Sequence, residues 1–290
     1  MAVVKKILRK IASLGNQKTK GSKIRRYLDG GAVPWSVGYN EYKFDFIEKQ
    51  IRNADQLRKF TQKTLGKNYG LGLDERVVEY PWIFSRINDG HANILDAGST
   101  FNYQTILDSI SLDHKRLTIF TYFPEKNCFH SKRINYVFGD LRDVPFKDSL
   151  FDLIVCQSTI EHVGMDNKIY GYSDGRNSND SPEYLKVIDE LVRVLASKGK
   201  LLLTFPFGKY KNYDFFQQFD SPMLTNVCNR MKEAGSFKLD FFKYEKEGWR
   251  FAAQEELTEV IAYNPHTGEG KLDDGAAHCR SIACIEFEKK

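Results

Sequence analysis

Residues 139–164 read GDLRDVPFKDSLFDLIVCQSTIEHVG, and this stretch decides the fold. Its apolar run over residues 151–156 is typical of a buried strand of a parallel sheet. The run is preceded by Asp140 in a turn and followed by polar residues that begin at Gln157. Ligands of open α/β sheets bind outside the carboxyl ends of the strands, so both flanks of this segment are expected at one cavity.

This stretch contains the pattern Asp-x-x-x-x-Pro-Phe-x-Asp-x-x-Phe-Asp, which begins at Asp140 and ends at Asp152. The pattern resembles the segment that leads into the fourth strand of class I S-adenosylmethionine-dependent methyltransferases. Upstream, Asp96 and Gly98 match the start of that family's Asp/Glu-x-Gly-x-Gly-x-Gly turn, with Thr100 and Asn102 in place of the later glycines. The Gly-x-Gly-x-x-Gly of dinucleotide-binding proteins is absent from this turn.

The resemblance implies an α/β fold with a Rossmann-like sheet of seven strands, mostly parallel, whose last strand is antiparallel. Besides residues 151–156, strands are expected at residues 93–97, 116–122, 134–138, 201–205, 237–244 and 281–287. Helices are expected at residues 103–111, 182–198 and 221–234. We divide the chain into a basic amphipathic tail (1–30), a helical cap (31–90) and a methyltransferase core (91–290). Within the cap, Glu79 and Tyr80 either cover a cofactor or simply pack.

S-adenosylmethionine is the cofactor that the resemblance implies. By resemblance, Asp140 accepts a hydrogen bond from the adenine with the Leu141 amide nearby, and Tyr122 is the candidate for stacking on the ring. The family usually has an acid at the end of the second strand to hold the ribose, and here Glu125 comes only later. The residues assigned to the cofactor are Asp96, Gly98, Ser99, Tyr122, Asp140, Leu141 and Gln157.

The acceptor side follows the fourth strand. His162 is the candidate general base because it follows this strand and an imidazole titrates near neutral pH, and Glu161 would orient it or contact the acceptor. The alternative is that Glu161 favours a helix N-terminus and His162 packs. Residues 164–181 form a long polar segment, which we interpret as an acceptor-binding loop rather than a disordered one.

Residues 158–167, with Pro34-Trp35-Ser36 and Glu79-Tyr80-Pro81-Trp82 upstream, make the chain similar to methyltransferases associated with bacterial surface-polysaccharide biosynthesis. This similarity implies O-methylation of a sugar or glycan hydroxyl on a small-molecule or glycan acceptor. The alternative is a catalytically degenerate methyltransferase fold that acts as a binding or scaffold module. The two changed glycine positions and the missing acid favour this alternative.

Composition and charge limit the partners. The chain has 41% hydrophobic and 28% charged residues and a net charge of +5, with no apolar run of the roughly 20 residues that span a bilayer. Its five cysteines match neither a disulfide framework nor a zinc motif, and His278 and Cys279 have no partnered spacing, so we expect no metal and a cytoplasmic protein. The basic tail is a solvated or packed helix, a contact with the anionic inner face of the membrane, or a nucleic-acid contact, which its lack of interleaved aromatic residues disfavours.

Overall fold

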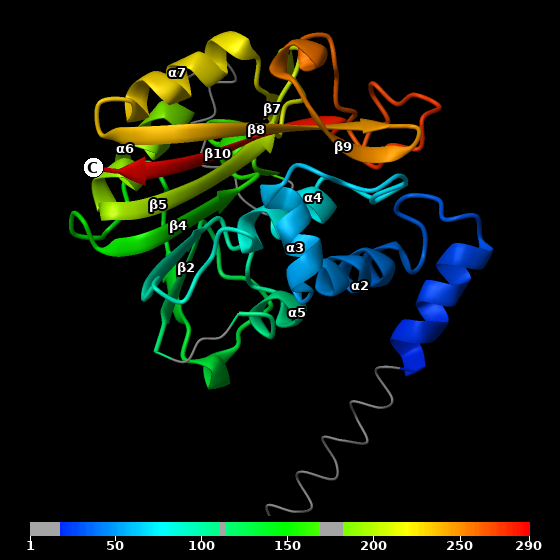
Figure 1. Cartoon of the computed structure of the whole chain (residues 1–290), viewed down its shortest axis with the longest axis horizontal. Helices are drawn as coiled ribbons and strands as arrows, with labels where there is room; N and C mark the ends of the chain where they lie inside the picture. Colours follow the sequence, from blue (N-terminus) through cyan, green and yellow to red (C-terminus); the bar gives the residue numbers. More distant parts are fainter. Residues whose placement is uncertain (1–17, 111–113, 169–181) are drawn as a thin grey trace, which may run out of the picture.

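A mixed sheet of eight strands organises the protein (Figure 1). The computed structural model describes residues 18–110, 114–168 and 182–290, so residues 1–17 of the amphipathic tail predicted over residues 1–30, and most of the predicted acceptor loop, lie outside the described residues. The strand order is β3-β2-β1-β4-β5-β10-β8-β9. The five strands from β3 to β5 are parallel, and β10 lies antiparallel between β5 and β8. The predicted antiparallel insertion of the last strand is therefore confirmed.

The prediction of seven strands is wrong by one, because a hairpin adds β9 (Gly248–Ala252) to the edge beside β8 (Gly235–Glu245). Gly248 has a φ of 93°, and a Cβ there would stand 2.5 Å from the carbonyl oxygen of Tyr69. Only glycine fits this tight reversal. The five-residue strand carries no clear alternation of apolar and polar residues, so the sequence pattern does not reveal it. A separate two-stranded sheet joins β6 and β7.

The strands and helices end close to where the sequence pattern predicts, with two exceptions. The predicted helix at residues 103–111 is described only as the short α5, and the helix predicted to end near residue 198 gives way to β5 at Leu195, which pairs with Phe151. The remaining elements are α2 (Tyr39–Ile51), α3 (Ala54–Thr61), α4 (Arg76–Phe84), β1 (Asn93–Ala97), α5 (Gln104–Leu107), β2 (Arg116–Thr121), η1 (His130–Lys132), β3 (Asn135–Phe138), β4 (Phe151–Gln157), η2 (Ile160–His162), α6 (Tyr184–Val194), β5 (Leu195–Pro206), β6 (Lys211–Asn212), β7 (Gln217–Gln218), α7 (Ser221–Met231), η4 (Gln254–Leu257) and β10 (Ser281–Lys289).

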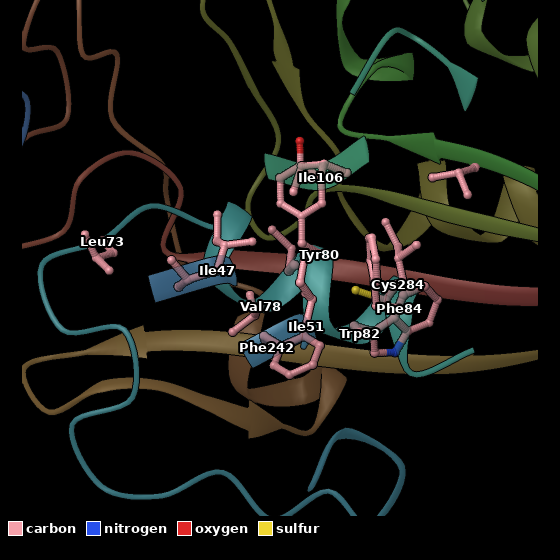
Figure 2. Close-up of a cluster of buried hydrophobic side chains, with 14 of the residues drawn as sticks. Ile47, Ile51, Leu73, Val78, Tyr80, Trp82, Phe84, Ile106, Phe242 and Cys284 are labelled. Atoms are coloured by element: carbon pink, nitrogen blue, oxygen red, sulfur yellow. The ribbon is translucent and has the colours of Figure 1, made fainter. Parts of the chain in front are cut away.

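Two apolar layers cover the two faces of the sheet. Because side chains alternate along a strand, Ile94 of β1 belongs to the layer beneath α2–α4, while its neighbour Leu95 belongs to the layer beneath α6 and α7. Figure 2 shows part of the first layer, in which Val78 and Trp82 of α4 belong to one cluster with Ile47 of α2 and Phe242 of β8. The cap therefore shares its hydrophobic core with the sheet.

Helix α4 contains Pro81, which has no amide hydrogen to donate to the carbonyl of Val77 one turn earlier. The hydroxyl of Tyr69 donates to that carbonyl instead, at 2.9 Å. The helix continues through the proline because a side chain satisfies the acceptor. This contact fixes the side chains of α4 that face the carboxyl ends of the strands.

A helix over residues 18–29 precedes the cap and packs on α2. Lys20 pairs with Asp45 and Glu48 of α2, and Tyr27 is fully buried. This part of the basic segment therefore belongs to the folded body. No helix among the described residues is long and apolar enough to cross a bilayer.

Candidate active site

An open cavity of about 790 Å³ lies at the carboxyl ends of the central strands and beneath the cap. Its walls come from the loops after β1, β2, β3 and β4 and from α2 and α4, as expected for an open α/β sheet. The lining residues that the argument uses are Arg76 from the cap, Gly98 and Ser99, Tyr122 and Glu125, Asp140 to Arg142, and His162.

The loop after β1 is shaped by Asp96. Its fully buried carboxylate accepts hydrogen bonds from the amide and hydroxyl of Thr100, at 3.1 and 3.0 Å, and from the amide of Phe101, at 2.7 Å. Burial raises the pKa of Asp96 to about 7. The carboxylate lies behind the cavity wall and does not line the cavity. Thr100, which stands where the family has a glycine, is one of its hydrogen-bond donors.

Gly98 and Ser99 form the part of this loop that reaches the cavity. Gly98 has a φ of 121°, and a Cβ there would stand 2.1 Å from Oγ1 of Thr159. A side chain would therefore separate the loop from the end of β4. The hydroxyl of Ser99 is buried and has no hydrogen-bond partner among the described residues. The residue lines the cavity, while its hydroxyl oxygen lies beneath the surface of the wall.

Asp140, Leu141 and Tyr122 all line the same end of the cavity, next to β2 and β3. The carboxylate of Asp140 is already engaged, because the guanidinium of Arg142 binds both of its oxygens at 2.6 to 3.0 Å. Arg142 also reaches Glu183, at 3.0 Å. Sequence reasoning missed this pairing, although the two-residue separation of Asp140 and Arg142 could have indicated it.

Glu125 lies in the cavity wall beside β2, four residues beyond the end of that strand. Its carboxylate accepts from the side-chain amide of Asn102 at 2.9 Å and from the hydroxyl of Thr121 at 3.3 Å. An acidic side chain, that of Glu125, therefore does lie beside the end of β2, although it comes four residues later in the sequence. No local signal in the sequence shows that the 122–125 loop folds back.

Glu79 connects the cap to the sheet. It is fully buried, and its carboxylate accepts from the hydroxyl of Ser158 at 2.5 Å, the hydroxyl of Thr204 at 2.6 Å and the side-chain amide of Gln157 at 3.2 Å. The carboxylate also forms an ion pair with Nη1 of Arg76, at 2.9 Å. Gln157 is thus turned toward Glu79 and does not line the cavity.

His162 follows β4 and lines the cavity at the end opposite Asp140. Its Nδ1 donates to the carbonyl oxygen of Phe215 at 2.7 Å, which leaves the lone pair on Nε2 in the neutral ring. Burial lowers the pKa of His162 to about 4. Glu161 is buried with Oε1 at 4.0 Å from Nε2, and burial raises its pKa well above the usual range. The His162 ring is therefore neutral near pH 7.

Glu75, His278 and Cys279 lie together outside the cavity wall. The Glu75 carboxylate is 3.2 Å from Nδ1 of His278 and accepts from the amide of Cys279 at 3.3 Å. Their ligand atoms lie within 4.8 Å of one another, a spacing that could hold a metal ion. Burial raises the pKa of the Cys279 thiol well above its usual range. The contact between Glu75 and His278 joins the start of α4 to the segment that precedes β10.

The fold and cavity define an α/β protein with an open cavity across the carboxyl ends of β3, β2, β1 and β4. Residues 110–203, about a third of the chain, match the family model described as a methyltransferase domain. The match covers the segment from β2 into β5, including Asp140 and His162. It supports the class that the sequence resemblance implies, the S-adenosylmethionine-dependent methyltransferases.

More distant similarities accompany this match. An uncharacterized protein of Methanocaldococcus jannaschii is 31% identical over 109 residues, which is 36% of each chain, so the chain spans about a third of this relative's length. The N-methyltransferase NodS of Bradyrhizobium japonicum, solved with S-adenosyl-L-homocysteine, is 16% identical with a TM-score of 0.37, over 85% of this chain and 98% of NodS. A 1,6-didemethyltoxoflavin-N1-methyltransferase of Burkholderia thailandensis is 11% identical with a TM-score of 0.38, over 69% of this chain and 72% of that enzyme. Similarities at this level say nothing about the substrate.

Proposed function

We propose that the protein transfers a methyl group from S-adenosylmethionine to a hydroxyl of a sugar or glycan. The observation that carries the proposal is one continuous cavity with Glu125 and Asp140 at one end and His162 at the other. Carboxylates suit the hydroxyl and amino donors of an adenosine, and a neutral imidazole suits an acceptor hydroxyl that must lose a proton.

The residues of the cavity fit the cofactor. Glu125 would accept from the ribose hydroxyls, Asp140 and the Leu141 amide would hold the adenine, and Tyr122 would cover it. Gly98 and Ser99 would contact the part of the cofactor next to the sulfur. The adenosine then lies over β2 and β3, and the methionine part lies over β1 and β4.

S-adenosylmethionine supplies a methyl group that its sulfonium already activates, so the chain mainly has to position the acceptor and exclude water. The cap wall of α2 and α4 covers the cavity on the side away from the strands. Phe215 holds the His162 ring through Nδ1, so Nε2 is the atom that accepts the proton of the acceptor hydroxyl. Burial raises the pKa of Glu161 beside the ring, which opposes a negative charge next to Nε2.

The choice of a glycan acceptor rests on the sequence similarity to surface-polysaccharide methyltransferases, and polar side chains in the cavity wall support it. Asn40 of α2 and Asn167 after η2 line the cavity, and side-chain amides are groups that bind sugar hydroxyls. A cytoplasmic location, with the basic tail of residues 1–30 in contact with an anionic membrane surface, remains a prediction.

Calorimetric titration with S-adenosylmethionine and S-adenosylhomocysteine tests the cofactor assignment. We expect both to bind with one site per chain. Radiolabelled methyl incorporation into nucleotide sugars and lipid-linked oligosaccharides then identifies the acceptor. Failure of both compounds to bind at millimolar concentration would favour the scaffold alternative, which the changed glycine positions suggested.

Glu125 provides a direct test of how the ribose is held. Glu125→Gln keeps the shape and the contact to Asn102 but removes the charge that favours two ribose hydroxyl donors. We expect S-adenosylhomocysteine to bind about 10- to 100-fold more weakly, the size of a hydrogen bond to a charged group. Asp143→Asn, a nearby acid that does not line the cavity, serves as the control. Unchanged affinity in Glu125→Gln would contradict the ribose assignment.

A further inference from the structure

Arg76 brings a positive charge from the cap into the cavity. It begins α4, lines the cavity wall, and has a side chain that is only 27% exposed. Its one ion pair among the described residues joins Nη1 to Glu79 at 2.9 Å. A guanidinium has five N–H donors in a planar fork. Within the described chain, we find no side-chain acceptor for its Nε and Nη2 donors.

Glu79 holds this guanidinium in place. Its carboxylate is anchored to the ends of β4 and β5 by Ser158 and Thr204, so Arg76 is fixed relative to the sheet as well as to α4. A partly buried cation that lines a cavity and has a fixed counter-ion behind it is suited to bind an anion.

The contacts of α4 show at which end of the cavity Arg76 lies. The hydroxyl of Tyr80 donates to the backbone carbonyl of Thr100, in the loop after β1. Arg76 lies four residues before Tyr80 and therefore on the same face of α4, one turn along. It thus lies near the ends of β1 and β4, away from Glu125 and Asp140.

Lys43, the other cap cation in the cavity wall, is less available to a ligand. Its ammonium group pairs with Asp74 at 2.6 Å, and its side chain is 9% exposed. The aromatic rings of Trp35, Tyr39 and Phe44 lie within 6 Å of its nitrogen. Arg76 is therefore the cap cation with donors left for an anion.

We propose that Arg76 binds the carboxylate of the methionine part of S-adenosylmethionine, which makes the cap a component of the cofactor site. The inference rests on the proposed function, because it takes the adenosine to lie over β2 and β3. That orientation places the cofactor's only carboxylate over β1 and β4, where the Arg76 fork is found. The cap then recognises the cofactor and does more than cover it.

Decarboxylated S-adenosylmethionine isolates this contact, because it lacks the carboxylate and keeps the ammonium, sulfonium and adenosine groups. We expect the wild-type protein to bind S-adenosylmethionine about 10- to 100-fold more tightly than the decarboxylated compound, as measured by calorimetry. In Arg76→Gln this ratio should fall to about 1, because only the carboxylated compound loses a partner. Arg76→Lys, which keeps the charge but not the fork, should give an intermediate ratio.

Glu125→Gln is the matched control, because it acts at the other end of the cofactor and should weaken both compounds by the same factor. The inference is overturned if Arg76→Gln keeps the wild-type ratio, or if the wild-type protein binds both compounds equally. If the wild-type protein binds neither, the proposed function itself fails, and that result is distinct from the other two. An Arg76→Gln variant that binds the decarboxylated compound with wild-type affinity is folded at the site, so a lost ratio cannot be assigned to misfolding.

Discussion

Replacement of Glu79 by alanine should lower the free energy of unfolding by about 3 to 5 kcal/mol, the cost of removing one partner of a buried ion pair. The carboxylate is fully buried and accepts from Arg76, Gln157, Ser158 and Thr204. Its removal leaves the partly buried Arg76 guanidinium without a counter-ion, and leaves the buried donors of Gln157, Ser158 and Thr204 without this acceptor. Urea denaturation followed by circular dichroism measures the change.

Glu183→Ala is the control for this prediction. Glu183 also accepts from an arginine, Arg142, but its side chain is 21% exposed. A partly solvated ion pair contributes about 0 to 1 kcal/mol, so the control should lose little stability. Equal losses in the two variants would show that Glu79 is no more than an ordinary ion-pair partner. The cap would then be joined to the sheet by its apolar contacts alone.

The positions of most strands were predictable because their signals are local. An apolar run bounded by turn residues marks β4, short apolar runs mark β1, β2 and β3, and alternating apolar residues mark β10. The eighth strand was not predictable, since β9 depends on the reversal at Gly248 and on its pairing with β8. Tertiary pairing of a short strand leaves little trace in its own composition.

The site was predictable to the extent that its residues follow strands. Gly98, Ser99, Tyr122, Asp140, Leu141 and His162 all line the cavity. Asp96 and Gln157 also follow the family pattern, but their side chains turn toward Thr100 and Glu79. Which side of a loop a side chain faces depends on partners distant in the sequence. Glu125 and Arg76 were missed for the same reason, because they reach the cavity through a loop and a cap helix.

Hydrogen bonds join the cap to the end of the fourth strand, just before the candidate base His162. Ser158 has a φ of 40° and donates to Glu79, so the backbone between β4 and His162 is held in a left-handed conformation by a contact with the cap. Such conformations persist only where their surroundings impose them. The position of the candidate base therefore depends on the cap as well as on the sheet.

The acid side of the pH–rate profile should reflect the depressed pKa of His162. The neutral ring is the form that can accept a proton, and burial lowers its pKa to about 4. The rate of methyl transfer should therefore stay level as pH falls from 8 to about 5, and decline only near pH 4, rather than near the ordinary imidazole value of about 6.5. The same pKa shift should lower the free energy of unfolding as pH falls from about 6.5 toward 4, because in this range His162 binds a proton in the unfolded chain but not in the folded protein. Circular dichroism at each pH separates loss of activity from loss of fold.

His162→Ala should slow the methyl-transfer step about 100-fold, the lower end of the usual contribution of a general base, because a ring with a low pKa is a weak base. Affinity for S-adenosylhomocysteine should stay near the wild-type value, since the proton moves only in the transition state. Single-turnover methyl transfer and calorimetry measure the two quantities separately. His266→Ala is the matched control, because His266 is exposed and also contacts the ring of Phe215, at 5.3 Å between ring centres. If His162→Ala instead loses stability and cofactor affinity together, the hydrogen bond from Nδ1 to Phe215 is structural, and the proton must leave through another group of the cavity.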